Sequence, residues 1–218
     1  KLYAKFHVIS TSNTTIRNVE NCFKRCQLSV NNYIVEPDAS ALACLSENEM
    51  NLGALLIDMG SSSSSFCIIS EGKLVYVGSS QLGGINITKD ISTILNINFE
   101  AAEKIKNLNS SLMISPLEEK EIIKLKFSDP NDGPNMIRIT RIELRDIIKS
   151  RLEEILESVK TELKSAGINL YTLNNIVITG GVASIVGIDK LATGVFEKNV
   201  RIGYPNKIEG IKSELVNP

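Results

Sequence analysis

Hydrophobic residues are densest between residues 52 and 81, where short apolar runs alternate with tight polar turns. Residues 55–57 form an unbroken apolar run, which is typical of a strand covered on both faces. This run ends at Asp58, and a loop of glycine and serine leads into a second apolar run. A tight turn at 71–72 then returns the chain into a third predicted strand over 73–81. The pattern therefore predicts an antiparallel meander at the centre of the chain.

The residues before the meander predict the beginning of an α/β fold. Apolar residues indicate a strand over 2–10, and helical spacing indicates a helix over 13–26 whose two cysteines pack in the core. A short strand at 33–35 and a helix of small residues at 36–45 are predicted to follow. Residues 47–51 are a polar connector, and we place the first boundary there.

The residues after the meander alternate between helical and strand patterns. A capping box that begins at Thr140 and ends at Glu143 predicts the start of the longest helix, and Gly167 predicts its end. Segment 128–135 contains no core-forming residue and is predicted to be a loop. The remaining predicted elements are helices over 83–95, 99–108 and 188–195 and strands over 121–127 and 176–178.

The composition excludes some partners. The chain has 24 Lys and Arg residues against 25 Asp and Glu residues, so no net charge favours nucleic acid or an anionic membrane surface. Its 4 cysteines show no CxxC spacing, which fits reduced, buried thiols in a cytoplasmic protein. No apolar run approaches the roughly 18 residues of a membrane span. Since the chain begins within a predicted strand and ends without a closing element, we expect it to be part of a longer protein.

The loop after the first strand of the meander carries the first candidate chemistry. Small residues at Gly60, Ser61, Ser62 and Ser63 allow backbone N–H groups to approach an anion closely. Asp58 would then hold a metal ion or an ordered water beside bound phosphates. A surface hairpin with a polar tip explains the same residues, so this segment alone leaves two hypotheses open.

Two glycine pairs repeat this signal. Gly83 and Gly84 open a predicted helix, where a phosphate could approach the positive end of the helix dipole. Thr179, Gly180 and Gly181 follow a predicted buried strand and are placed to receive a nucleotide. A Gly-Gly pair also forms plain turns, so each pair by itself is a weak indication.

Two charged groups have both a functional and an ordinary explanation. Glu103 and Lys106 lie three residues apart on one predicted helix face, where they could contact a sugar or pair with each other in solvent. Arg141, Arg145 and Arg151 gather near the start of the longest helix, where the dipole disfavours cations. The arginines indicate either an acidic partner or a solvated helix face.

The motifs in this order resemble those of a known superfamily. They are Leu-Ile-Asp-Met-Gly at 56–60, Gly-Gly at 83–84, Ala-Glu-Lys-Ile-Lys at 102–106, Thr-Gly-Gly at 179–181 and Arg-Ile-Gly-Tyr-Pro at 201–205. Together with residues 7–10 and 36–43, they resemble the actin, hexokinase and heat-shock-chaperone ATPases, and most closely the bacterial FtsA cell-division family. The resemblance runs nearly the whole length of the chain. It implies an α/β, actin-like (ribonuclease-H-like) ATPase fold, with a mixed sheet, flanking helices and a smaller α+β subdomain.

The resemblance also implies how the chain divides. Residues 1–32 match the end of a domain inserted in the first actin-like half, and residues 33–51 match the end of that half. Residues 52–110 and 173–218 match the sheet core of the second half, and residues 111–172 match its smaller subdomain. We expect the phosphate loop of the first half and the family's C-terminal membrane helix to lie outside this chain.

ATP with Mg²⁺ is the cofactor that the resemblance implies, and Asp58 matches a position that holds Mg²⁺ through a bound water. The positions that match the nucleotide site are Asp58, Gly60, Ser61, Ser62, Ser63, Gly83, Gly84, Glu103, Lys106, Thr179, Gly180 and Gly181. Relatives usually carry Gly-Gly-Thr or Gly-Ala-Gly-Thr after Asp-x-Gly, whereas this chain has a run of serines. Because serine tolerates positive φ less well than glycine, we expect a looser loop or weaker ATP binding.

For function, the resemblance implies an ATP-binding scaffold with weak or no ATPase activity that joins FtsZ to the membrane and forms actin-like filaments. Arg141, Arg145 and Arg151 match the region that receives the C-terminal tail of FtsZ. The protein would act on the cytoplasmic face of the inner membrane at the division site, with other division proteins. Two alternatives stay open: a pilus-assembly ATPase that binds a peptide of a pilus membrane protein, and a sugar kinase, whose carboxylate base the sequence does not reveal.

Overall fold

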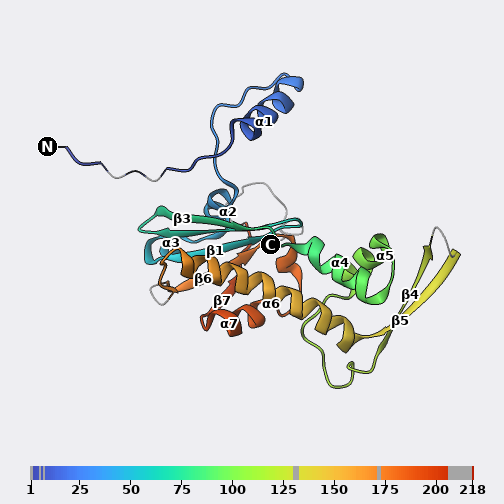
Figure 1. The fold of residues 1–218 in the computed structure, drawn as a ribbon. Helices are drawn as coiled ribbons and strands as arrows, with labels where there is room; N and C mark the ends of the chain where they lie inside the picture. Colours follow the sequence, from blue (N-terminus) through green and yellow to red (C-terminus); the bar gives the residue numbers. More distant parts are fainter. Residues whose placement is uncertain (1, 5, 7, 130–132, 171–172, 206–217) are drawn as a thin grey trace.

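The computed structural model describes all residues of the chain except 1, 5, 7, 130–132, 171–172 and 206–217. A five-stranded sheet forms its centre, with helices on both faces, and a two-stranded hairpin projects at one end (Figure 1). The strands of the sheet are, in spatial order, β3 (Lys73–Ser80), β2 (Ser64–Ser70), β1 (Ala54–Met59), β6 (Asn175–Thr179) and β7 (Val200–Ile202). The predicted α/β fold with a mixed sheet is therefore confirmed.

The pairing of the strands combines a local and a distant part of the sequence. Strands β1, β2 and β3 are antiparallel neighbours, which confirms the predicted meander. Strand β6 pairs in parallel with β1, so that Leu56 lies opposite both Cys67 and Val177. Strand β7 continues the parallel part of the sheet beside β6. The carboxyl ends of β1 and β6 consequently meet at one edge, where Asp58 pairs with Thr179.

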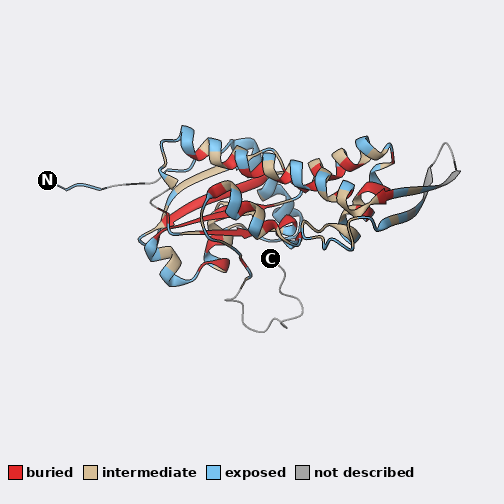
Figure 2. Cartoon of the chain, turned by 90° about the horizontal axis from the view of Figure 1, so that it is seen from below, coloured by how far each residue is buried: buried red, intermediate tan, exposed pale blue. Residues whose placement is uncertain are grey.

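Most of the helices lie on the two faces of the sheet, whereas α1 stands apart from it (Figure 1). The helices are α1 (Asn13–Arg25), α2 (Glu36–Cys44), α3 (Glu47–Leu52), α4 (Gly84–Leu95), α5 (Phe99–Asn109), α6 (Arg141–Ser165) and α7 (Ile188–Phe196), with a short 3-10 helix η2 (Gly181–Ser184). Because successive side chains of a strand point to opposite faces, Leu55 and Ile57 pack with α6 and α7. Leu56 packs on the other face with Cys44 and Leu45, at the end of α2. Buried residues accordingly concentrate in the strands and in the helix faces turned toward them (Figure 2).

Helix α6 is the longest element, and it spans the distance between the hairpin and the sheet (Figure 1). Its predicted capping box is confirmed, since the Thr140 hydroxyl accepts from the Glu143 N–H and the Glu143 carboxylate accepts from the Thr140 N–H. Gly167 follows its last turn at φ +74°, as predicted. Its Ser158 hydroxyl donates to Ser80 of β3 over 3.0 Å. The predicted subdomain boundaries at residues 111 and 172 stay a prediction. Helix α6 lies inside the predicted small subdomain, and it also contacts the sheet core through Ser80.

The hairpin corrects the predicted loop at 128–135. Strand β4 (Ile122–Asp129) pairs in antiparallel register with β5 (Gly133–Thr140), and only 130–132 lie outside the described residues. The loop prediction rested on composition, and it failed because cross-strand pairing with β4 gives the backbone of 133–135 its hydrogen bonds despite a glycine and a proline. The predicted strand over 121–127 is confirmed apart from its first residue.

The N-terminal part of the chain departs most from the prediction. The described residues of 2–10 and 33–35 form no strand, and α1 buries none of its residues. The α1 helix was correctly predicted, but Ser12 caps it, and Cys22 and Cys26 are exposed where core packing was predicted. A strand is stable only beside a partner strand, and no described strand lies beside these segments. The expected connector at 47–51 lies within helix α3, because Ser46 and Glu49 form a second capping box.

None of the helices in the described part of the chain combines the length and the apolar character that crossing a bilayer requires.

Candidate functional site

A cavity of about 460 Å³ opens at the edge where β1 and β6 end. It lies between the loop after β1, the start of α4, one face of α5, and η2 with the residues that follow it. Six of the predicted nucleotide-site residues line it, namely Gly60, Ser61, Gly84, Glu103, Lys106 and Gly181. These residues come from four separate stretches of the sequence, and the fold brings them together.

The loop after β1 is a tight turn that presents backbone donors. The Gly60 N–H donates to the Ser63 carbonyl over 3.0 Å, which closes the turn. Ser61 and Ser62 are exposed, and within the described residues their N–H groups donate to no other group. Successive N–H groups of this kind form an anion-binding concavity. The predicted contact of this loop with a phosphate stays a prediction, and these free N–H groups are compatible with it.

The Gly83-Gly84 pair has a packing role that the sequence did not reveal. The Gly84 N–H donates to the Gly60 carbonyl over 3.0 Å, and the Ile85 N–H donates to the Ser61 carbonyl over 2.8 Å. A Cβ atom on Gly83 would lie 2.6 Å from the Ser61 carbonyl oxygen, so only glycine allows this approach. The prediction assumed free backbone donors at this helix start, and that assumption is wrong because the loop carbonyls already take them. Gly84 nevertheless lines the cavity.

Asp58 is held at the end of β1 by two neighbours. The Ser40 hydroxyl of α2 donates to its Oδ2 atom over 2.6 Å. On its other side Gly180, at φ +91°, is so close that a Cβ there would lie 2.5 Å from Oδ1. The carboxylate is half-buried and its position is fixed by elements distant in the sequence. Ser40 was not predicted as a site residue, since nothing in its helix distinguishes it from a residue that packs on the sheet.

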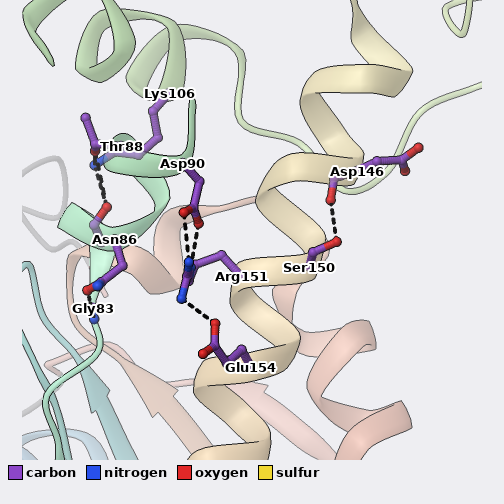
Figure 3. A network of polar contacts seen from close by, with 10 residues as sticks. Gly83, Asn86, Thr88, Asp90, Lys106, Asp146, Ser150, Arg151 and Glu154 are labelled. Atoms are coloured by element: carbon purple, nitrogen blue, oxygen red, sulfur yellow. Dashed lines mark hydrogen bonds and ion pairs between the residues drawn. The ribbon is translucent and has the colours of Figure 1, made fainter. Parts of the chain in front are cut away.

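Glu103 and Lys106 pair with each other, but at the cavity rather than in open solvent. The Lys106 Nζ atom lies 2.7 Å from Glu103 Oε2 and 3.2 Å from the Gly84 carbonyl. It also lies 2.8 Å from the hydroxyl of Thr88, and Figure 3 shows these two side chains next to each other. The Thr88 hydroxyl also donates to Glu103. Burial raises the pKa of Glu103, but the hydrogen bonds from Lys106 and Thr88 outweigh it and lower the pKa below its ordinary value. The fully buried Thr88 was missed by the sequence analysis, because a threonine inside a helix gives no signal of its own.

Thr179 lies in the predicted place but faces away from the cavity. Its hydroxyl donates to the Gly203 carbonyl over 3.1 Å and lies 3.6 Å from Cys44 Sγ. It therefore supports the packing of β6 against β7 and α2. Gly181 faces open space, with no atom within 4 Å of an added Cβ.

The three arginines predicted to receive an acidic partner have carboxylates of the same chain beside them. Arg141 pairs with Glu121 at 2.6 Å, Arg145 pairs with Asp146 at 2.7 Å, and Arg151 pairs with both Asp90 and Glu154 (Figure 3). The sequence spacing did not show these ion pairs. The choice between an acidic partner and a solvated helix face stays a prediction.

The arrangement at Asp58 fits a divalent cation that arrives with its ligand. Within the described residues, no group of three or more His, Cys, Asp or Glu side chains could hold a metal ion. Mg²⁺ is usually bound by one or two carboxylates together with phosphate oxygens and waters. A single carboxylate beside an anion-binding loop therefore fits Mg²⁺ bound with phosphates, and does not fit a cation held by the protein alone.

The mixed sheet, the tight loop after β1 and the cavity at the strand ends define an actin-like ATPase fold. Among solved structures, MreB5 of Spiroplasma citri bound to ADP superposes with a TM-score of 0.74 at 23% identity, covering 88% of this chain and 61% of that chain. The PilM-PilN type IV pilus biogenesis complex gives a TM-score of 0.63 at 19% identity, covering 87% and 47%. At these identities the likeness establishes the fold alone.

The sequence comparisons go further and establish the family. A family model for the cell division protein FtsA matches residues 55–218. The cell division protein FtsA of Agrobacterium fabrum is 30% identical over 212 residues, covering 97% of this chain and 48% of that protein. The corresponding protein of Bacillus subtilis is 36% identical over 201 residues, covering 92% and 45%. The chain belongs to the FtsA family of cell-division proteins, as its motifs predicted, and spans about half the length of these curated relatives.

Proposed function

We propose that this chain is the nucleotide-binding second half of an actin-like cell-division scaffold that links FtsZ to the cytoplasmic membrane. The observation that carries the proposal is that free loop N–H groups and the Glu103–Lys106 pair meet at one cavity in an FtsA-family chain. Asp58 lies near the end of β1, the strand that leads into this loop. ATP hydrolysis would be weak or absent. The scaffold would self-associate into filaments and contact other division proteins at the cytoplasmic face of the inner membrane, to which a segment outside this chain would attach it.

The cavity and the residues around it would each contact one part of ATP. The N–H groups of Ser61, Ser62 and Ser63 would bind phosphate oxygens, and Asp58 would hold Mg²⁺ through a water. The Glu103 carboxylate and the Lys106 ammonium would bind the ribose hydroxyls. Hydrogen bonds to the ribose would then replace the ones that these two side chains now make within the protein. Bound Mg²⁺ would neutralise part of the phosphate charge. The remaining members of the predicted set, Gly60, Gly83, Gly84, Thr179, Gly180 and Gly181, would shape the backbone around the phosphates and the adenosine.

Calorimetric titration of the full-length protein and of this chain with ATP and Mg²⁺ tests the proposal. We expect this chain to bind at least about tenfold more weakly, because the first half would supply other phosphate donors. Lys106→Met in the full-length protein should lower ATP affinity by about tenfold. Lys104→Met is the matched control, since Lys104 is exposed on the same helix and does not line the cavity. Equal losses in both variants, or no loss in either, would contradict the assigned site.

We propose further that the face around Arg141, Arg145 and Arg151 receives the acidic and apolar C-terminal tail of FtsZ. A guanidinium binds a carboxylate through two parallel hydrogen bonds, and neighbouring apolar residues such as Ile94 and Ile147 would contact the apolar part of the tail. The present ion pairs of the arginines would have to open for this exchange.

A binding titration with an FtsZ tail peptide tests this second part. Arg151→Glu in the full-length protein should weaken binding by about 2 kcal/mol, and the loss should shrink as salt rises. Lys149→Gln is the control, because Lys149 is an exposed cation of the same helix. A peptide from a pilus membrane protein should bind no better than a scrambled peptide. Preference for the pilus peptide would favour the pilus-assembly alternative.

A further inference from the structure

The guanidinium of Arg151 on α6 is engaged by Asp90 on α4, 61 residues away in the sequence (Figure 3). Its Nε atom lies 2.5 Å from Asp90 Oδ2 and its Nη2 atom lies 2.8 Å from Oδ1. Both oxygens of one carboxylate therefore occupy the Nε–Nη2 edge, one of the two edges through which a guanidinium can bind a carboxylate by two hydrogen bonds. Glu154 accepts a further hydrogen bond from Nη1. The side chains of Arg151 and Asp90 are 22% and 24% exposed, so the pair is partly shielded from solvent.

The surroundings of the pair combine apolar contact with an excess of negative charge. A hollow of about 420 Å³ lies between α4 and α6, and Arg151 is its one basic residue among the described lining residues. Its carboxylates come from Asp90, Asp146 and Glu154. Ile94, whose side chain is 62% exposed, supplies an apolar wall. An acidic peptide would find a suitable guanidinium and a suitable apolar surface here, but the Nε–Nη2 edge of the guanidinium is occupied.

We infer that Asp90 is an internal competitor for the acidic peptide and that its release from Arg151 opens the docking site. The inference rests on the proposed function, because it assumes that an acidic peptide docks on this face of α6. The exchange replaces one carboxylate by another on the same guanidinium, so the number of ion pairs is unchanged. Its cost is the transfer of Asp90 into solvent and the repulsion between the peptide and the remaining carboxylates. Asp90 thereby holds the affinity of the wild-type site below what the guanidinium could provide.

The experiment measures the affinity of the full-length protein for the acidic FtsZ tail peptide at low salt. Asp90→Asn removes the competing charge and keeps the side-chain size, so we expect binding to tighten by about three- to tenfold. Glu153→Gln removes the same charge from an exposed position on α6 that pairs with Lys149, so it reports the general effect of net charge. Arg151→Gln is measured alone and combined with Asp90→Asn. The comparison tells whether an increase in peptide affinity caused by Asp90→Asn requires the Arg151 guanidinium. Circular dichroism checks that every variant is folded.

The inference that Asp90 competes with the peptide is supported by two results together. Asp90→Asn must increase peptide affinity more than Glu153→Gln does, and this increase must disappear when Arg151→Gln is also present. Binding by Asp90→Asn where the wild type binds nothing also supports it. Unchanged or weaker binding by folded Asp90→Asn, or a gain that persists without Arg151, would overturn it while leaving the docking face in place. If no variant binds the peptide, the proposed docking face itself is rejected and the competitor with it.

Discussion

The glycines of the site differ sharply in what they do, although the sequence presents them as similar pairs. Gly180 has φ +91° and ψ 168°, a conformation that is essentially restricted to glycine, and it lies against Asp58. Its neighbour Gly181 has an ordinary backbone conformation and open space where a Cβ would be. One residue therefore fixes the position of the carboxylate, and the next one lines the cavity.

We expect Gly180→Ala to lower the free energy of unfolding by about 3 kcal/mol, because it adds both backbone strain and a clash with Asp58 and Met59. Gly181→Ala is the matched control and should change stability by less than about 0.5 kcal/mol. Urea denaturation of this chain followed by circular dichroism measures both. Similar losses in the two variants would show that the close approach at Asp58 does not constrain position 180.

Helix α3 and the edge strand β7 are joined by an ion pair between residues that are 152 positions apart in the sequence. The Arg201 guanidinium donates to both oxygens of Glu49, each over 2.7 Å, and also to the Cys44 carbonyl over 2.9 Å. These hydrogen bonds lower the pKa of Glu49 from 4.5 to about 2, and burial opposes them only in part. Glu49 also caps α3 through Ser46, so the same carboxylate begins the helix and holds the edge strand.

The lowered pKa of Glu49 predicts a pH dependence of stability. In the unfolded chain the carboxyl would titrate near 4.5, so the stabilisation is complete above that pH and is lost as the pH falls toward about 2. Because Arg201 is 43% exposed, we expect this contribution to be only about 1 kcal/mol. Urea unfolding across this pH range should show a smaller acid loss in Glu49→Gln than in the wild type. Glu47→Gln, on the exposed side of the same helix, should retain the wild-type slope.

The described residues divide into a compact part, built on the sheet, and an N-terminal part that has no buried residue. None of the described residues before Pro37 is buried, and α1 stands apart from the sheet in Figure 1. Strands β1 and β6, the helices on both faces and the cavity between them all belong to residues 36–203. The folding stability of the chain should therefore come almost wholly from this larger part.

We expect removal of residues 1–30 to shift the thermal midpoint by less than about 2 °C, because the deleted segment buries no residue that the structure describes. Leu152→Ala, by contrast, removes a fully buried side chain of α6 and should cost about 3 kcal/mol. Differential scanning calorimetry measures both. A large drop for the truncated chain would mean that α1 packs against the sheet in solution.

The sequence by itself determined the elements whose signals are local. Leu144, Ile148 and Leu152 recur at helical spacing, and the capping box at Thr140 marks the helix start, so α6 was predicted almost to the residue. The apolar run of β1 predicted a strand covered on both faces for the same reason. The family also followed from short motifs, and six of the twelve positions that these motifs indicated line the cavity. Each of these signals lies within a few neighbouring residues.

Only the tertiary structure decided which distant residues meet. The resemblance had already implied that the segments of β1 and β6 share one sheet, but the hydrogen bond from Ser40 to Asp58 and the pair of Asp90 with Arg151 appeared only in the structure. Such contacts depend on where packing places whole elements, and no local pattern encodes that placement. The same reason explains why the partners of two groups were not foreseen: loop carbonyls accept from the N–H groups at the start of α4, and carboxylates of the same chain pair with the α6 arginines.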